Sequence, residues 1–231
     1  MFIAANWKMN LGKSEIDHFS NILQSNEFHE RIDVCIFPPS VYINYLNTRI
    51  ENLPISIGGQ NCYHELSGAF TGEVSPVSLK DIGCEYVLLG HSERRNNNNE
   101  NNLYIQKCVS AAINSNLTPI ICVGETLKDR ETGVALDFIE KQLNESIPPS
   151  FKNIFVAYEP IWSIGTGKMP SKSEIKEMHK YIKQVISSKF NMKIKVIYGG
   201  SVNPSNVCDI LCIDEVDGVL IGGASLNPKD F

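Results

Sequence analysis

Several short apolar segments of the sequence end in a polar or ionisable residue that could take part in chemistry. The clearest is FVAYEPIWSIGTGK (155–168), where an apolar segment ends at Glu159 and a mostly apolar loop follows. A carboxylate at a strand end is usually a solvated rim residue, but Pro160, Ile161 and Trp162 would cover this one. Because loss of water raises the basicity of a carboxylate, the pattern predicts a general base in a dry pocket beneath a lid.

The ends of other apolar segments supply groups that such a base would need. Read in order, they give Asn6, Lys8, His91, Ser201, Gly222 and Gly223. An imidazole and a cation can stabilise charge that develops on a substrate oxygen, and glycines let backbone N–H groups approach a phosphate. Because His91 precedes Ser-Glu, which could begin a helix, the positive helix end would keep its ring neutral. One histidine and one carboxylate are too few for a metal site, so no metal is expected.

Eight short apolar segments, with amphipathic stretches between them, would position these residues. The segments are 2–8, 33–38, 55–61, 86–91, 118–124, 154–159, 194–200 and 217–223. Several are rich in β-branched residues, as buried parallel strands are. Between them, 132–146 and 171–190 repeat apolar residues at helical spacing, and the second opens with the capping-box pattern Ser171-x-x-Glu174. Eight such alternations without a composition break predict a single α/β domain over 1–231, a closed (β/α)8 TIM barrel.

An open, doubly wound sheet is the alternative fold, but its dinucleotide fingerprint is missing after the first strand. Two stretches fit the barrel less well. The segment RRNNNNENN (94–102) is rich in asparagine, so we expect a longer loop there and a helix that begins near Glu100. After the eighth strand only ASLNPKDF (224–231) follows, so we expect the final outer helix to be truncated or to lie beyond the given residues.

The composition argues against several classes of partner. The 231 residues carry a net charge of −5, whereas general nucleic-acid binding needs a basic face. No apolar run approaches the roughly 20 residues of a membrane helix, and the first ten residues lack signal-peptide features. Seven irregularly spaced cysteines favour free thiols in a reducing cytosol. The sequence therefore predicts a cytoplasmic protein without nucleic-acid or membrane partners.

Motifs along nearly the whole chain resemble the triosephosphate isomerase family. They are Asn6-x-Lys8, GQNCY (59–63), GAFTGE (68–73), GHSERR (90–95), CVGE (122–125), AYEPIWSIGTGK (157–168), YGGSV (198–202) and GVLIGGASL (218–226). The motifs occur in family order, and the two long ones around His91 and Glu159 are highly specific. The resemblance implies a cofactor-free isomerase of glycolysis and gluconeogenesis. It would interconvert dihydroxyacetone phosphate and D-glyceraldehyde 3-phosphate by proton transfer through an enediol(ate).

The resemblance also implies a role for individual residues of the site. Glu159 would be the base that moves a proton between the two carbons, and His91 the neutral group that polarises the carbonyl. Lys8 would supply positive charge, Asn6 would orient the substrate, and Glu93 would support the site.

The resemblance further implies a phosphate grip, a lid and a partner subunit. Phosphate-binding residues, besides Asn6 and Lys8, would be Gly165, Ser201, Gly222 and Gly223. Lid residues would be Pro160, Ile161, Trp162, Gly165, Thr166, Gly167 and Lys168. In a homodimer the loop 59–73 would protrude, with Thr71 near its tip reaching the partner's copy of the site.

Two other functions stay open on the sequence alone. A barrel that binds a sugar phosphate without turning it over would be a scaffold or a sensor. A different phosphosugar barrel enzyme would share the phosphate-binding glycines, but it would not share both GHSERR and YEPIW. A coupled isomerase assay separates these possibilities.

Overall fold

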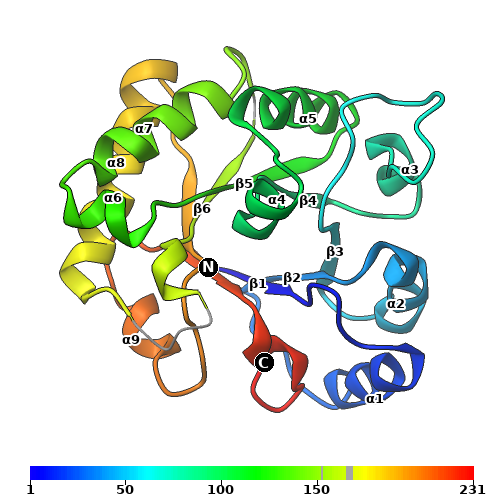
Figure 1. Cartoon of the computed structure of the whole chain (residues 1–231). Coiled ribbons are helices and arrows are strands. Elements are labelled where there is room, and N and C mark those ends of the chain that lie inside the picture. The colour runs from blue at the N-terminus through cyan, green and yellow to red at the C-terminus, as the bar shows by residue number, and fades with distance from the viewer. Residues whose placement is uncertain (152, 165–168) are drawn as a thin grey trace.

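Parallel strands close into a barrel in the computed structural model, which describes residues 1–151, 153–164 and 169–231 (Figure 1). In chain order the strands are β1 (Phe2–Asn6), β2 (Asp33–Phe37), β3 (Ile55–Gly59), β4 (Tyr86–Leu89), β5 (Thr118–Val123), β6 (Phe155–Tyr158), β7 (Lys195–Tyr198) and β8 (Gly218–Ile221). Each strand pairs with its neighbour in sequence, and β1 also pairs with β8. The predicted (β/α)8 barrel is confirmed, and the open sheet is excluded.

Helices surround the barrel, as Figure 1 shows. They are α1 (Lys13–Leu23), α2 (Ile43–Ile50), α3 (Pro76–Asp81), α4 (Ser92–Asn97), α5 (Asn102–Asn114), α6 (Leu127–Glu131), α7 (Ala135–Ser146), α8 (Lys172–Phe190) and α9 (Val207–Leu211). Short 3-10 turns are η1 (Ser40–Tyr42), η2 (Ile161–Ser163) and η3 (Gly223–Leu226). The predicted capping box at Ser171 and Glu174 is confirmed at the start of α8. Within the described residues, no helix has both the length and the apolar character of a membrane span.

The asparagine-rich segment differs from the predicted loop. Residues 92–97 form α4, and α5 begins only at Asn102. The asparagines between and beside these helices serve as caps: Asn98 ends α4, and the Asn101 side chain accepts the N–H of Tyr104. Asn99 takes a left-handed conformation with φ 55°, which asparagine tolerates better than most residues. The helix predicted to begin near Glu100 is therefore confirmed as α5, whereas the start of the expected loop is the short helix α4.

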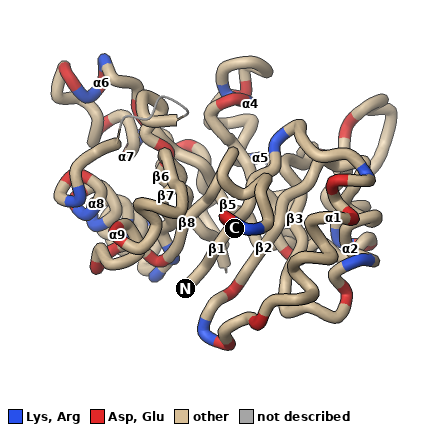
Figure 2. Tube along the Cα trace, turned by 90° about the horizontal axis from the view of Figure 1, so that it is seen from below, with Lys and Arg blue, Asp and Glu red and all other residues tan. Residues whose placement is uncertain are grey.

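Side chains fill the barrel and close its N-terminal end. The inner core consists of Phe2, Ala4, Cys35, Phe37, Leu88, Ile120, Cys122, Phe155, Ala157, Ile197 and Leu220. At the bottom, the rings of Phe2 and Phe155 meet edge to face with centroids 4.8 Å apart, and Tyr86 packs against both. Charged residues lie mainly on the outer helices and loops (Figure 2). A ligand site formed by the strands must therefore lie at the opposite end, where the strands finish.

Candidate active site

A cavity of about 350 Å³ opens at the C-terminal ends of the strands. Its lining comes from five strand ends and the segments after them: Asn6, Lys8, His91, Glu159, Ile164, Gly199, Gly200, Ser201, Val202, Asn203, Leu220, Gly222, Gly223 and Ala224. The structure thus brings together seven of the residues singled out in the sequence, from Asn6 to Gly223. Glu93 lies in an adjoining hollow of about 220 Å³ that shares Asn6, Lys8 and His91.

Glu159 directly follows β6, and only 2% of it is exposed. Its Oε1 lies 3.5 Å from Nε2 of His91, and its Oε2 accepts the backbone N–H of Ser92 at 3.3 Å. That N–H belongs to the first turn of α4, where the free backbone donors favour negative charge. A side chain at Gly124 would lie 1.8 Å from the backbone carbonyl oxygen of Glu159, so glycine is required where the two backbones pass each other.

His91 is the N-terminal cap of α4, as the following Ser-Glu suggested. Its Nδ1 accepts the backbone N–H of Glu93 at 3.2 Å. A ring nitrogen that accepts a hydrogen bond carries no proton, so the neutral ring holds its hydrogen on Nε2. Because Nε2 faces Glu159 and the cavity, His91 can donate a hydrogen bond to a ligand oxygen there.

Lys8 is held in an unusual backbone conformation with φ 52°. Its N–H donates to Oδ1 of Asn6 at 3.0 Å, and its carbonyl accepts from Nε2 of Gln60 at 2.7 Å. Its Nζ lies 2.6 Å from Oε1 of Glu93, and its Cε lies 3.6 Å from the point where a side chain on Gly222 would begin. A left-handed lysine costs about 1–2 kcal/mol, and these contacts hold the ammonium group at the cavity.

Ser201, Gly222 and Gly223 line the part of the cavity formed by the segments after β7 and β8. A side chain at Gly223 would meet no atom within 4 Å, so its absence leaves room for a ligand in front of the backbone. Both donors of Ser201 are engaged by Ser163: its N–H lies 3.3 Å from Oγ of Ser163, and its Oγ donates to the Ser163 carbonyl at 2.6 Å.

The start of the predicted lid is anchored to a buried carboxylate. Glu125 is fully buried, and its Oε1 accepts from the hydroxyl of Tyr158, the indole N–H of Trp162 and the guanidinium of Arg130, at 3.0 to 3.1 Å. The N–H of Ile161 donates to the Glu125 carbonyl. Gly165, Thr166, Gly167 and Lys168 lie outside the described residues.

Sequence reasoning missed Arg95, which supports the histidine from behind. Its guanidinium donates to the carbonyls of Gly90 at 2.7 Å and Cys122 at 3.0 Å, and to Oδ1 of Asn102 at 2.6 Å. Burial lowers the pKa of Arg95. Its hydrogen bonds tie the end of β4, just before His91, to the end of β5. The signal in the sequence was an arginine one helical turn after a candidate catalytic residue.

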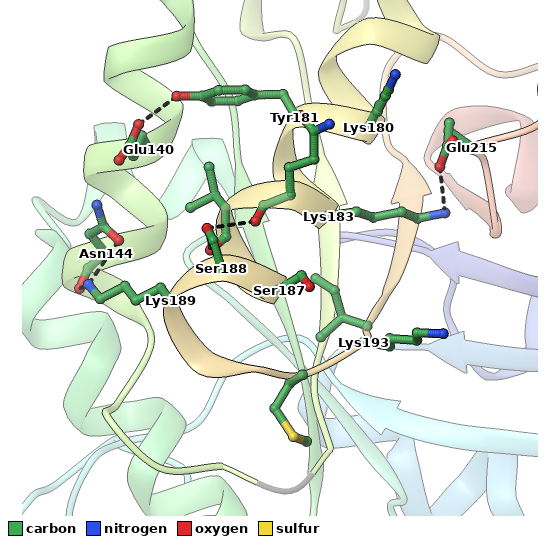
Figure 3. Close-up of a pocket in the computed structure, with 14 residues that line it drawn as sticks. Glu140, Asn144, Lys180, Tyr181, Lys183, Ser187, Ser188, Lys189, Lys193 and Glu215 are labelled. Atoms are coloured by element: carbon green, nitrogen blue, oxygen red, sulfur yellow. Dashed lines mark hydrogen bonds and ion pairs between the residues drawn. The ribbon is translucent and has the colours of Figure 1, made fainter.

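A larger hollow of about 1090 Å³ lies on the outer helices between α7, α8 and residues 192–194 (Figure 3). Its polar groups largely bind one another: Lys183 pairs with Glu215 at 3.3 Å, and the Tyr181 hydroxyl donates to Glu140 at 2.5 Å. Its lining contains neither a histidine nor a cysteine. Size alone does not make it the active site, since it lies away from the strand ends. Among the described residues, no group of three His, Cys, Asp or Glu side chains could hold a metal ion.

Comparison with known proteins gives a consistent result over the whole chain. A family model described as triosephosphate isomerase matches residues 1–231. A triosephosphate isomerase of Dictyoglomus thermophilum is 40% identical over 238 residues, which cover 99% of this chain and 96% of that protein. One of Syntrophotalea carbinolica is 40% identical over 240 residues, with 100% and 95% covered. One of Finegoldia magna is 38% identical over 238 residues, with 99% and 95% covered.

Proposed function

The chain belongs to the triosephosphate isomerase family, and we propose that it interconverts dihydroxyacetone phosphate and D-glyceraldehyde 3-phosphate. The reaction is a step of glycolysis and gluconeogenesis, and it needs no cofactor in this proposal. The observation that carries the assignment to this site is the pair of Glu159 and His91, 3.5 Å apart at the mouth of the barrel. A buried carboxylate beside a neutral imidazole is what proton transfer next to a carbonyl requires.

In this mechanism Glu159 removes a proton from the carbon beside the substrate carbonyl and returns it to the neighbouring carbon. The carbonyl oxygen gains charge as the proton leaves, and Nε2–H of His91 donates a hydrogen bond to it. As the carbon proton is returned, the hydroxyl proton of the neighbouring oxygen passes to the former carbonyl oxygen, with Nε2 of His91 as the group that can donate one proton and accept the other. Lys8 adds positive charge on the same side, and Glu93 holds its ammonium group in place. Asn6 orients the substrate and fixes the Lys8 backbone through its side-chain oxygen.

The phosphate group binds at Ser201, Gly222 and Gly223, in the segments after β7 and β8. Open space in front of Gly223 supports this placement, because a backbone N–H can reach an anion there without a side chain in the way. We also propose Gly165 as a phosphate-binding residue, on the basis of the sequence motif alone. Pro160, Ile161 and Trp162 would form the rigid start of a lid, and the anchoring of Trp162 to Glu125 supports a defined position for it.

The experiment that tests the assignment is a coupled isomerase assay on wild type, Glu159→Ala and Glu159→Asp. We expect kcat to fall about 10²- to 10⁴-fold in the Ala variant, the usual contribution of a general base. Binding of inorganic phosphate should largely survive. Glu177→Ala is the matched control, since Glu177 is an exposed carboxylate on α8. Near-normal turnover by Glu159→Ala would refute the assignment of Glu159 as the general base. A wild-type protein that binds phosphate but has no isomerase activity would favour a sensor.

We also propose that the protein is a homodimer through the loop 59–73. Large apolar side chains are exposed on and near this loop: 47% of Leu66, 40% of Phe70 and 93% of Met9. The hollow of about 220 Å³ beside Asn6 would receive Thr71 of the partner subunit. Phe70→Asp should therefore lower both the dimer fraction on sizing and the activity, whereas Val134→Asp, on another exposed apolar site, should change neither. A fully active wild-type monomer would contradict the proposal.

A cytoplasmic location is the last part of the proposal. It rests on the seven cysteines, all of them free, which suit a reducing compartment. Fractionation of the source cells is the measurement, and recovery of the protein outside the cytoplasm would contradict it.

A further inference from the structure

Ser163 is a buried hydroxyl for which neither the sequence nor the proposed mechanism supplies a role. It ends the short turn η2 after Glu159, and its side chain is fully buried. Burying a hydroxyl is costly unless it forms hydrogen bonds. Its Oγ has two neighbours at hydrogen-bonding distance, Oη of Tyr198 at 3.4 Å and the N–H of Ser201 at 3.3 Å.

Through these contacts Ser163 occupies donors that the proposed function assigns to phosphate. The Ser201 N–H points to Oγ of Ser163, and the Ser201 hydroxyl donates to the Ser163 carbonyl. Ser201 also lines the cavity, and the proposed function gives its N–H to a phosphate oxygen. Ser163 is therefore an internal acceptor that competes with the ligand.

The geometry makes this acceptor easy to displace. At 3.3 Å the N–H bond is long, since N–H to oxygen bonds are commonly about 2.9–3.0 Å. A phosphate oxygen carries negative charge, and such acceptors form hydrogen bonds roughly twice as strong as neutral ones. When Ser201 turns to the ligand, Oγ of Ser163 still has Tyr198 as a partner, so no buried hydroxyl is left unpaired.

Gly200 leaves space for this arrangement. A side chain there would begin 2.2 Å from Oη of Tyr198 and 2.9 Å from Oγ of Ser163. The two hydroxyls can thus meet beneath the backbone only because residue 200 is glycine. The group consists of Ser163, Tyr198, Gly200 and Ser201, and it joins the end of β7 to the segment after β6.

We propose that the Ser163 hydroxyl is a positioning residue that satisfies the Ser201 N–H in the empty site and yields it to the phosphate of a phosphate-monoester ligand. The inference rests on the proposed function, because that function assigns Ser201 to phosphate. The hydroxyl lowers the affinity for phosphate by stabilising the free protein. In exchange, the Ser201 N–H keeps a defined protein partner in the empty site.

The test uses calorimetric titration with inorganic phosphate together with the isomerase assay. In Ser163→Ala the competing acceptor is gone, so phosphate should bind about 2- to 10-fold tighter, the range of one ordinary hydrogen bond. KM should fall by a similar factor while kcat changes less. Ser20→Ala is the matched control, since Ser20 is also buried but bonds within α1, and its phosphate affinity should equal that of wild type.

Tyr198→Phe gives a result of the opposite sign. Without the Tyr198 hydroxyl, release of Ser201 leaves the Ser163 hydroxyl without this partner, so phosphate should bind about 2- to 10-fold more weakly. In the Ser163→Ala background the same substitution should have no further effect. Unchanged or weaker binding in Ser163→Ala, with the fold intact by circular dichroism, would overturn the inference. If the variants show the expected shifts in phosphate affinity but the wild type has no isomerase activity, the proposed reaction is overturned and the inference stands. A wild type that binds no phosphate would overturn both.

Discussion

Acid should destabilise the protein through His179, a fully buried histidine of α8. The ring packs against Tyr158 and Tyr198, with centroid distances of 5.9 and 6.4 Å. Its Nδ1 lies 3.3 Å from the Glu215 carbonyl, and within the described structure its Nε2 has no hydrogen-bond partner. Burial lowers the pKa of His179 from 6.5 to about 4, and the contact with the Glu215 carbonyl opposes this only in part.

The direction of the pH effect on stability follows from comparing His179 in the folded and unfolded protein. Two charged neighbours face the ring: Lys183 disfavours the protonated form and Asp217 favours it. Between pH 6.5 and about 4, His179 is protonated in the unfolded chain but stays neutral in the folded protein. The stabilising contribution is thus complete above pH 6.5 and is lost as the pH falls through this window. At about 1.36 kcal/mol per pH unit, the full loss is roughly 3 kcal/mol, with about 2.5 kcal/mol gone by pH 4.5.

Urea unfolding of wild type and His179→Asn at pH 7.5, 5.5 and 4.5 measures this, at one protein concentration in case the protein dimerises. The variant will be less stable at pH 7.5 because it packs less well. The gap between the two proteins should then narrow by about 2.5 kcal/mol at pH 4.5. His18→Asn, at an exposed histidine of α1, should give a constant gap. A constant gap for His179→Asn as well would refute the reasoning.

Three further predictions concern the frame around the site. Gly124→Ala places a methyl group 1.8 Å from the Glu159 carbonyl, so kcat should fall about 10²-fold in the isomerase assay; unchanged kcat would show that the backbone adapts. Arg94→Leu leaves the nearly buried Glu100 carboxylate without its partner at 2.7 Å and should cost about 3 kcal/mol in urea unfolding, most of it recovered by adding Glu100→Leu. Asn99→Ala should cost about 1 kcal/mol because of its φ of 55°, and Asn99→Gly less; equal losses would contradict the role of backbone strain.

Local patterns carried much of the fold and the placement of the site. Each strand is a short apolar segment, and parallel strands in a barrel bring their C-terminal ends to one rim. That rule alone was enough to place Glu159 and His91 together, although 68 positions separate them. The capping box of α8 was readable because its two partners lie three residues apart.

Contacts between distant residues were not readable in the same way. Nothing in the sequence singled out Ser163, because its partners Tyr198 and Ser201 lie 35 and 38 residues further along. The role of Arg95 was not readable either, because its carbonyl acceptors at Gly90 and Cys122 lie at the ends of two different strands. In the asparagine run, the turn and the helix that begins near Glu100 were predicted, but α4 was not, because asparagine is a poor residue for a helix interior.

The pairing of β1 with β8 has a consequence for synthesis of the protein. Phe2 lies opposite both Asp33 and Gly218, so one side of β1 finds its partner 216 residues later in the chain. At about 5–20 residues per second, a ribosome needs roughly 10 to 40 seconds to make that stretch. Throughout this time the nascent chain presents an unpaired strand edge, a surface prone to wrong pairing. Protection by chaperones should therefore matter most during elongation, before the last strand emerges.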